Sequence, residues 1–196
     1  MNDQELRAAL LAARDERQRS LRRALGGTAV MLGANLPGAD KHRPGVARML
    51  RAALEALDRD IGLELLESRD DRLGLFHLAA TGAAPAAAKA AALRLEAASP
   101  SGRLLDLDVY GPDGLPWDRA MLGLPARTCL VCAAPARECI LLRRHAGPEL
   151  GERVEALLRP WVTEDGAAAP PGPARSPALP GRCGRAAPGC AGRSPR

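Results

Sequence analysis

The chain has 196 residues, and its two Trp, one Tyr and one Phe leave Ala, Leu and Val to build most of any core. The formal net charge of +5 comes from five arginines that follow Asp165, so residues 1–165 are formally neutral. A neutral domain with so few aromatic side chains lacks the basic surface and the stacking platform of a nucleic-acid-binding protein, and we expect no nucleic-acid partner.

Membrane and secretory signals are also missing from the sequence pattern. No apolar run approaches the roughly 18 residues of a membrane span, and the opening residues MNDQELRAAL contain acids and no apolar centre of a secretory signal. We therefore expect a cytoplasmic protein with no membrane partner. Because thiols stay reduced in that compartment, clustered cysteines would indicate metal binding or catalysis rather than disulfides.

The first half of the chain predicts two helices and three strands. A helix is indicated over 3–25 by three- and four-residue spacings among Leu6, Leu10, Ala13, Arg17, Leu21 and Leu25, and it ends at two glycines. The run TAVMLGANL predicts a strand over 28–36, and a helix over 44–61 follows, with Pro at its start and Gly at its exit. The runs LELLES and RLGLFHLAA predict strands in a hairpin that turns at Asp70 and Asp71.

The second half continues the mixture of helices and strands. An Ala-rich helix is expected over 85–98, then a strand within SGRLLDLDVY, residues 101–110. A turn at 112–114 would bring GLPWD back beside that strand, and a last helix is expected over 148–161. These elements predict an α+β, or mixed α/β, fold with a partly antiparallel sheet and flanking helices.

The composition changes near the end of the chain. Of the 31 residues in 166–196, 13 are Gly or Pro. Such a segment cannot bury enough apolar surface to fold. We therefore expect one domain over 1–165 and a disordered Pro/Gly/Arg-rich tail over 166–196.

Two carboxylates lie two residues apart in LLDLDVY. Because strands alternate faces, Asp106 and Asp108 share one face with Tyr110, while Leu105 and Leu107 share the other. Neighbouring carboxylates disfavour each other's ionisation, so a cation is expected between them. Mg²⁺ takes oxygen ligands from one or two carboxylates and completes its shell with water and substrate phosphates. The spacing alone leaves two interpretations open, a magnesium site or a solvated strand face.

The segment CLVCAAPARECILLRRH spaces Cys129, Cys132, Cys139 and His145 as C-x2-C-x6-C-x5-H. A C-x2-C pair lets both sulfurs reach one ion, and a third Cys with a His can complete a tetrahedral Zn²⁺ site. Free cysteines are also common as small buried hydrophobes. A zinc site and a structural cluster of packed side chains both remain open, and Cys139 is expected on a helix.

Four blocks in this order carry a family resemblance: RDERQ (14–18), NLPGADK (35–41), SPSGRLLDLDV (99–109) and PARTCLVC with the later Cys and His (125–145). Together they resemble the citrate lyase holo-acyl-carrier-protein synthase family, also called apo-citrate lyase phosphoribosyl-dephospho-CoA transferase. The resemblance extends from about residue 10 to about residue 160. The third and fourth blocks are its most specific parts.

The resemblance implies a nucleotidyltransferase-type enzyme, with a nucleotidyltransferase-like fold as one expectation. Its donor would be 2′-(5″-triphosphoribosyl)-3′-dephospho-CoA, its acceptor a serine of the apo acyl carrier subunit of citrate lyase, and its by-product diphosphate. Asp106 and Asp108 would then be catalytic and would hold Mg²⁺ against the triphosphate. The implied substrate-binding residues are Gly102, Arg103, Arg127, Arg14, Arg17 and Lys41.

The sequence departs from the family pattern after the third Cys, and two alternative functions stay open. The family usually has Ala-Arg after the third Cys, where this chain has Ile140 and Leu141. If that arginine grips phosphate, this chain would use Arg143 or Arg144 instead, or bind phosphate more weakly. A different acceptor, such as the carrier protein of malonate decarboxylase, is one alternative function. A non-enzymatic interaction module stabilised by a Cys/His zinc site is the other.

Overall fold

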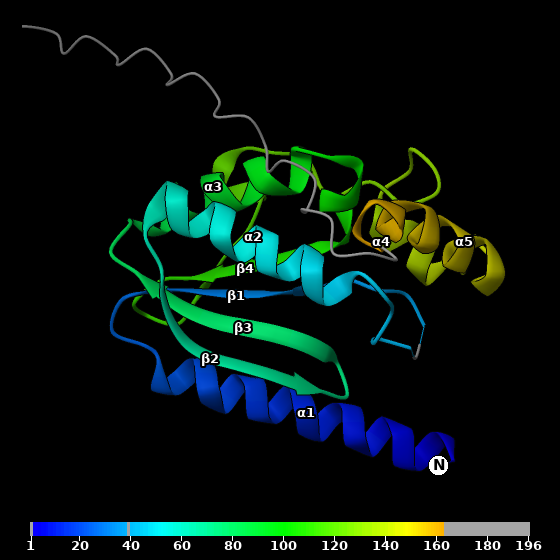
Figure 1. Cartoon of the computed structure of the whole chain (residues 1–196), viewed down its shortest axis with the longest axis horizontal. Helices are drawn as coiled ribbons and strands as arrows, with labels where there is room; N and C mark the ends of the chain where they lie inside the picture. Colours follow the sequence, from blue (N-terminus) through cyan, green and yellow to red (C-terminus); the bar gives the residue numbers. More distant parts are fainter. Residues whose placement is uncertain (1, 39, 163–196) are drawn as a thin grey trace, which may run out of the picture.

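The computed structural model describes residues 2–38 and 40–162 and shows a five-stranded sheet with helices on both faces (Figure 1). The predicted disordered tail, 166–196, and the predicted domain end at residue 165 lie outside the described residues. Among these residues no helix combines the length and apolarity needed to cross a bilayer. The elements are α1 (Asp3–Arg23), β1 (Thr28–Ala34), α2 (Val46–Ile61), β2 (Glu64–Asp71), β3 (Gly74–Thr81), α3 (Pro85–Ala97), η1 (Pro100–Leu104), β4 (Leu105–Tyr110), β5 (Pro116–Trp117), η2 (Ala120–Leu122), α4 (Ala136–Leu141), α5 (Gly147–Leu158) and η3 (Arg159–Trp161).

The strands lie in the order β2-β3-β1-β4-β5, and every neighbouring pair is antiparallel. The predicted α+β class is confirmed, and the antiparallel pairing extends further than expected. The α2 crossover connects β1 to a strand of the same direction, β2. The β2–β3 hairpin then places β3 between them, so these two strands never pair.

The hairpin turns two residues later than predicted. Asp71 pairs with Gly74, so the turn consists of Arg72 and Leu73. The Leu73 amide donates to the Asp71 carboxylate at 2.7 Å, which fixes the turn. Asp71 is thus the last residue of β2, and its side chain also shapes the turn. Because Asp is common within turns, the sequence alone placed it in the turn rather than at the end of the strand.

Two hydrophobic cores form on opposite faces of the sheet. On one face α2 and α3 pack on β1 and β4, with Leu50, Ala92 and Leu107 among the buried residues. On the other face α1 contributes Leu21, which packs with Phe76 and other side chains of β1 and β3. Figure 1 shows α2 and α3 above the sheet and α1 below it. Because β1 is covered on both faces, its sequence is continuously apolar rather than alternating.

Strand β4 separates its side chains between the two faces, as its alternation predicted. Leu105, Leu107 and Val109 are buried, whereas Asp106 and Asp108 are exposed. The expected return of GLPWD is confirmed in β5, which pairs only with the last two residues of β4. The edge of β4 that precedes this short pairing is therefore left without a neighbouring strand.

Candidate functional site

Asp106 and Asp108 lie on the face of the sheet that carries α1. Their cross-strand partners on β1 are Gly33 and Met31, and Met31 belongs to the smaller core with Leu21 of α1. The Asp106 side chain is 51% exposed. Both carboxylates are therefore accessible to a ligand on this face.

The environment of Asp108 disfavours the negative charge of its carboxylate. Burial against the surrounding protein, followed by the charge of Asp106, raises the pKa of Asp108 to about 6, although solvent reaches part of the side chain. Burial and then the two aspartates raise the pKa of Tyr110, the next residue on this face, to about 12. A bound cation would relieve this repulsion.

Two cationic side chains occupy the open edge of β4. The Arg127 guanidinium donates to the Leu105 carbonyl at 2.9 Å, and Lys89 of α3 donates to the Leu107 carbonyl at 2.8 Å. Arg127 Nη1 also lies 3.9 Å from Asp106 Oδ1. The sequence indicated Arg127 and missed Lys89, because a single Lys in an Ala-rich helix carries no signal of its own. Lys89 is nevertheless only 6% exposed.

A buried carboxylate on α3 holds Arg127 in place. Glu96, whose side chain is 7% exposed, pairs with Arg127 at 2.5 Å and with Arg119 at 3.2 Å. Buried charges in proteins are paired, because an unpaired one would be very costly. Glu96 and Arg119 were absent from the predicted site, since their contacts join α3 to segments more than 20 positions later in the chain.

Arg103 and Gly102 fasten the neighbouring segments. Arg103 donates to the Thr128 carbonyl at 3.0 Å, to its hydroxyl at 3.1 Å and to the Cys129 carbonyl. The Gly102 amide donates to Ser99, and a Cβ at Gly102 would lie 2.6 Å from the Glu96 carbonyl oxygen. Close packing against α3 thus requires this glycine. Phosphate contacts at both positions stay predictions.

The predicted arginines of α1 lie on the same face of the sheet as the aspartate pair. Arg17 binds Asp71 through two hydrogen bonds of 2.9 and 2.7 Å, donates to the Gly74 carbonyl at 2.6 Å and lies 4.2 Å from the centre of the Phe76 ring. Arg14 is exposed, and its charge acts on Tyr110. Arg17 therefore joins α1 to the β2–β3 hairpin, and its predicted contact with substrate remains untested.

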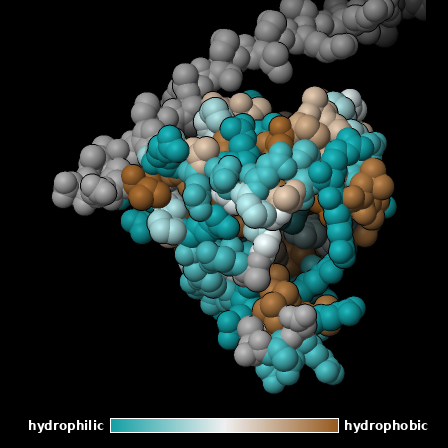
Figure 2. Space-filling view, turned by 90° about the vertical axis from the view of Figure 1, so that its right-hand side faces the viewer, coloured by the Kyte–Doolittle hydropathy of each residue, from teal (hydrophilic) through white to brown (hydrophobic). Residues whose placement is uncertain are grey.

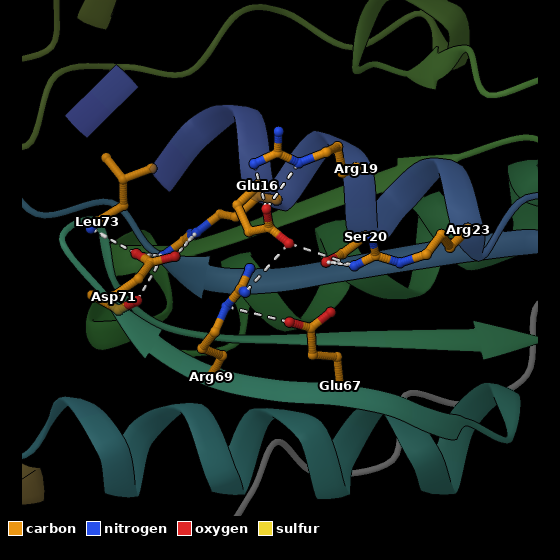
Figure 3. Close-up of polar contacts among 10 residues, drawn as sticks. Glu16, Arg19, Ser20, Arg23, Glu67, Arg69, Asp71 and Leu73 are labelled. Carbon is orange, nitrogen blue, oxygen red and sulfur yellow. Dashed lines mark hydrogen bonds and ion pairs between the residues drawn. The ribbon is translucent and has the colours of Figure 1, made fainter. Parts of the chain in front are cut away.

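Figure 3 shows the rest of this charged contact between α1 and the hairpin. Glu16 of α1 accepts from Arg19 at 2.5 Å and lies 3.6 Å from Arg23 and 3.7 Å from Arg69. Arg69 also pairs with Glu67 at 3.3 Å. The RDERQ block thus supplies ion pairs that join α1 to the β2–β3 hairpin.

Lys41 lies in the loop between β1 and α2. Its amine donates to the Leu36 carbonyl, and burial lowers its pKa. A Cβ at Gly74 would lie 3.1 Å from the Lys41 Cβ, so this loop packs on the hairpin that Arg17 holds. A phosphate contact by Lys41 also stays a prediction.

A cavity of about 750 Å³ opens beside Arg127. Its wall combines apolar residues, such as Leu93 and Leu130, with Asn35 of the NLPGADK block. Four arginines also line it, from different parts of the chain: Arg103, Arg119, Arg127 and Arg143. A cavity with apolar walls and several cationic groups suits a ligand that carries both organic rings or chains and phosphates.

The predicted Cys/His residues come together beside this cavity, and Cys129, Cys139 and His145 are part of its wall. The ligand atoms of Cys129, Cys132, Cys139 and His145 all lie within 4.8 Å of one another. Cys132 Sγ is 3.5 Å from Cys139 Sγ and 3.4 Å from His145 Nε2. The other ring nitrogen of His145 lies 3.3 Å from Glu149. Within the described residues, this is the one group of three or more Cys, His, Asp or Glu side chains that could hold a metal ion.

Local hydrogen bonds favour a negative sulfur in the cluster. The Ala134 amide, followed by His145, lowers the pKa of Cys132 to about 7, and the hydrogen bond with Cys132 raises the pKa of His145. Burial and then the neighbouring thiols raise the pKa of Cys139 to about 11. The Val131 amide donates to Cys129 Sγ at 3.5 Å. Amide donors to cysteine sulfurs support the thiolates that metal ions require.

Residues 6–161 match the family model described as apo-citrate lyase phosphoribosyl-dephospho-CoA transferase. The chain belongs to this family. Curated relatives of that name come from Citrobacter koseri, 46% identical over 70 residues, and from Escherichia coli O139:H28, 41% identical over 70 residues. Each alignment covers 36% of this chain, and the chain spans 38% of the length of these relatives.

The predicted family resemblance is thereby confirmed. The span matched to this transferase family contains the aspartate pair, the four cavity arginines and the Cys/His cluster. The structure connects them through Arg127, which contacts Asp106 and lines the cavity.

Proposed function

We propose that the protein transfers a phosphoribosyl-dephospho-CoA group from 2′-(5″-triphosphoribosyl)-3′-dephospho-CoA to a serine of the apo acyl carrier subunit of citrate lyase. Diphosphate would be the second product. The observation that carries this proposal is the position of Arg127, between the aspartate pair and the cavity. A reacting phosphate at the pair and the organic body of the donor in the cavity would both contact this arginine.

A divalent metal fits the aspartate pair. Asp106 and Asp108 are exposed on one strand face, and their environment disfavours two bare negative charges. Mg²⁺ is often held by one or two carboxylates together with water and substrate phosphates, so the pair would be a sufficient protein contribution. Mg²⁺ bound there would neutralise charge on the triphosphate.

The carrier serine is the nucleophile of the transfer, and arginine side chains of this chain would stabilise the reacting phosphates. The serine oxygen forms a bond to the α-phosphorus of the donor, the bond from that phosphorus to the bridging oxygen breaks, and diphosphate leaves with that oxygen. Water takes up the serine proton. Arg127 and Arg103 would stabilise the negative charge that develops on the phosphoryl oxygens. Arg119 and Arg143, which line the same cavity, would hold the donor's phosphates.

We also propose that the Cys/His cluster holds Zn²⁺. Three cysteines with one histidine form a common closed tetrahedral zinc set, and a carboxylate on the second histidine nitrogen, here Glu149, commonly orients such a ligand. The reaction would take place in the cytoplasm, where the three free thiols remain reduced. Metal analysis of the purified protein should find about one zinc per chain.

The decisive experiment mixes the protein with apo carrier protein, donor and Mg²⁺ and measures the mass of the carrier. We expect the mass of one prosthetic group on the carrier serine, with diphosphate released in equal amount. Asp106→Asn and Asp108→Asn should each lower the rate by about a hundredfold or more. Asp60→Asn is the matched control, because Asp60 pairs with Arg94 on the surface.

Each alternative function gives a different result in the same assay. If the carrier protein of malonate decarboxylase is modified faster than that of citrate lyase, the acceptor is the malonate decarboxylase carrier. Stoichiometric zinc with no diphosphate release from the wild-type protein would favour an interaction module. Normal carrier modification by both Asp→Asn variants would contradict the assignment of the aspartate pair.

A further inference from the structure

Three consecutive large apolar side chains are exposed at the end of α4. Ile140, Leu141 and Leu142 are 74%, 71% and 67% exposed, and the exposed Arg143 and Arg144 follow them directly. We call residues 140–144 the ILLRR segment. Contiguous exposed apolar groups with a polar rim are typical of interaction surfaces.

The ILLRR segment is held at both ends. Cys139 and His145, two members of the Cys/His cluster, flank it directly. The Arg144 amide donates to the Cys139 carbonyl at 3.0 Å, and Arg143 has a φ of 46°, which is uncommon for a side chain other than glycine. The apolar residues therefore lie on a turn that a backbone hydrogen bond closes.

The segment also borders the proposed donor site. Ile140 and Arg143 line the cavity, whereas the side chains of Leu141 and Arg144 are not part of its wall. Figure 2 views the end of the molecule where α4 and α5 lie, and separate hydrophobic patches interrupt its mainly hydrophilic surface. A protein bound on the segment would thus lie at the cavity that holds the donor.

The charge of the ILLRR segment and of the four residues before it discriminates between the possible binding partners. Residues 136–144 contain three arginines and one acid, Glu138. The chain after Asp165 contains arginines and no acids, so it would be repelled from this surface. A second copy bound face to face would set arginines against arginines. The matching partner has an apolar patch with acidic side chains around it.

We infer that the ILLRR segment is the docking surface for the carrier protein, which binds it through such an acidic-rimmed apolar patch and brings its serine to the cavity. This inference rests on the proposed function. Leu141 and Leu142 bury apolar surface on the carrier, and Arg144 attracts its acids. Attraction of this kind raises the association rate and decreases with added salt.

The test measures carrier modification by Leu141→Ser and Arg144→Glu. Each variant should raise the KM for the apo carrier by about tenfold or more and leave kcat and the KM for the donor unchanged. Arg144→Glu should also reduce the salt dependence of the KM for the carrier. Leu65→Ser and Arg59→Glu, at exposed positions on β2 and α2, are the matched controls and should behave as the wild type.

The outcomes separate this inference from the proposed function. If the wild-type protein forms no adduct on the carrier, the proposed function fails. If it forms the adduct and Arg144→Glu keeps the wild-type KM for the carrier, the docking surface is overturned and the function stands. A wild-type dimer that Leu141→Ser dissociates without a change in that KM would assign the surface to a second copy instead. Zinc content and melting temperature equal to the wild type would show that the variants are folded.

Discussion

Asp106 and Asp108 take their positions from a regular strand, whereas Cys129, Cys132 and Cys139 belong to a segment with little regular structure. Strand β4 is hydrogen-bonded to β1 along its length and anchored by alternate buried side chains. Between β5 and α5, the chain forms only η2, the short α4 and one isolated bridge, from Thr128 to Pro135. The sheet therefore fixes the carboxylates, and a few side-chain contacts fix the cysteines.

This difference indicates what each region needs in order to stay folded. The aspartate pair has backbone support that does not depend on a ligand. The segment over 118–146 is fastened by Arg103, by the Glu96 pairs and by the Cys/His cluster itself. We expect a metal to be structural in the second region and catalytic in the first.

The largest effect on folding should follow loss of the Cys/His cluster. Cys139→Ser, or removal of zinc with EDTA followed by restoration of Mg²⁺, should expose the amides of residues 125–146 to rapid hydrogen exchange and leave those of β1 and β4 protected, because structural zinc sites supply folding energy. Carrier modification should fall by about tenfold or more, since Arg127 and Arg143 lie in this segment. Hydrogen exchange measured by mass spectrometry compares the two regions directly.

The control for this prediction is Cys183→Ser, at a cysteine outside the described residues. It should change neither zinc content nor exchange. Equal loss of protection in the sheet and in 125–146 would contradict the contrast, because it would show that the cluster supports the whole domain.

A smaller effect is expected at the junction of the two regions. Glu96→Gln removes the charge that pairs with Arg119 and Arg127, so both guanidiniums lose a buried partner. The free energy of unfolding should fall by about 1–3 kcal/mol, and the KM for the donor should rise. Glu155→Gln is the matched control, since Glu155 is 73% exposed and lies 3.4 Å from Arg43. Denaturant unfolding and steady-state kinetics provide the two measurements, and an unchanged donor KM would remove Glu96 from the support of the cavity.

The sequence could predict what depends on local spacing. Period-two alternation placed Asp106 and Asp108 on one strand face, and the C-x2-C spacing with its later Cys and His identified the cluster. It could not predict the site residue Glu96 or the ion-pair partner of Arg17, because both depend on tertiary packing. Arg17 pairs with Asp71, 54 positions away, rather than with a neighbour on its helix. The cavity was also hidden, since its wall comes from loops and helices that only the fold brings together.

Asp71 and Asp108, two carboxylates on the α1 face of the sheet, should change the stability of the protein with pH in opposite directions. Asp71 should have the larger effect. Burial opposes its charge, but hydrogen bonds from Arg17 and Leu73 lower its pKa overall. Its contribution to stability is therefore complete above the unfolded pKa, near 3.8, and is lost as the pH falls through the lower folded pKa. Asp71→Asn should cost about 1–3 kcal/mol at pH 7 and less at pH 3. Urea unfolding at both pH values tests this, with Asp60→Asn as control.

Asp108 should give the smallest change, with the opposite sign. Its pKa is raised to about 6, so the folded protein binds this proton more tightly than the unfolded chain, and stability is lost as the pH rises from about 4 to about 6. Asp108→Asn should therefore stabilise the metal-free protein at pH 7.5, by less than about 1 kcal/mol because solvent screens the site, and have no such effect at pH 3.5. Added Mg²⁺ should reduce the advantage of Asn by stabilising the wild type. Loss of transfer together with a gain in stability would show that Asp108 serves the reaction at a cost in stability, whereas Asp71 stabilises the fold. Destabilisation by Asp108→Asn at pH 7.5 would place both carboxylates in the same structural role.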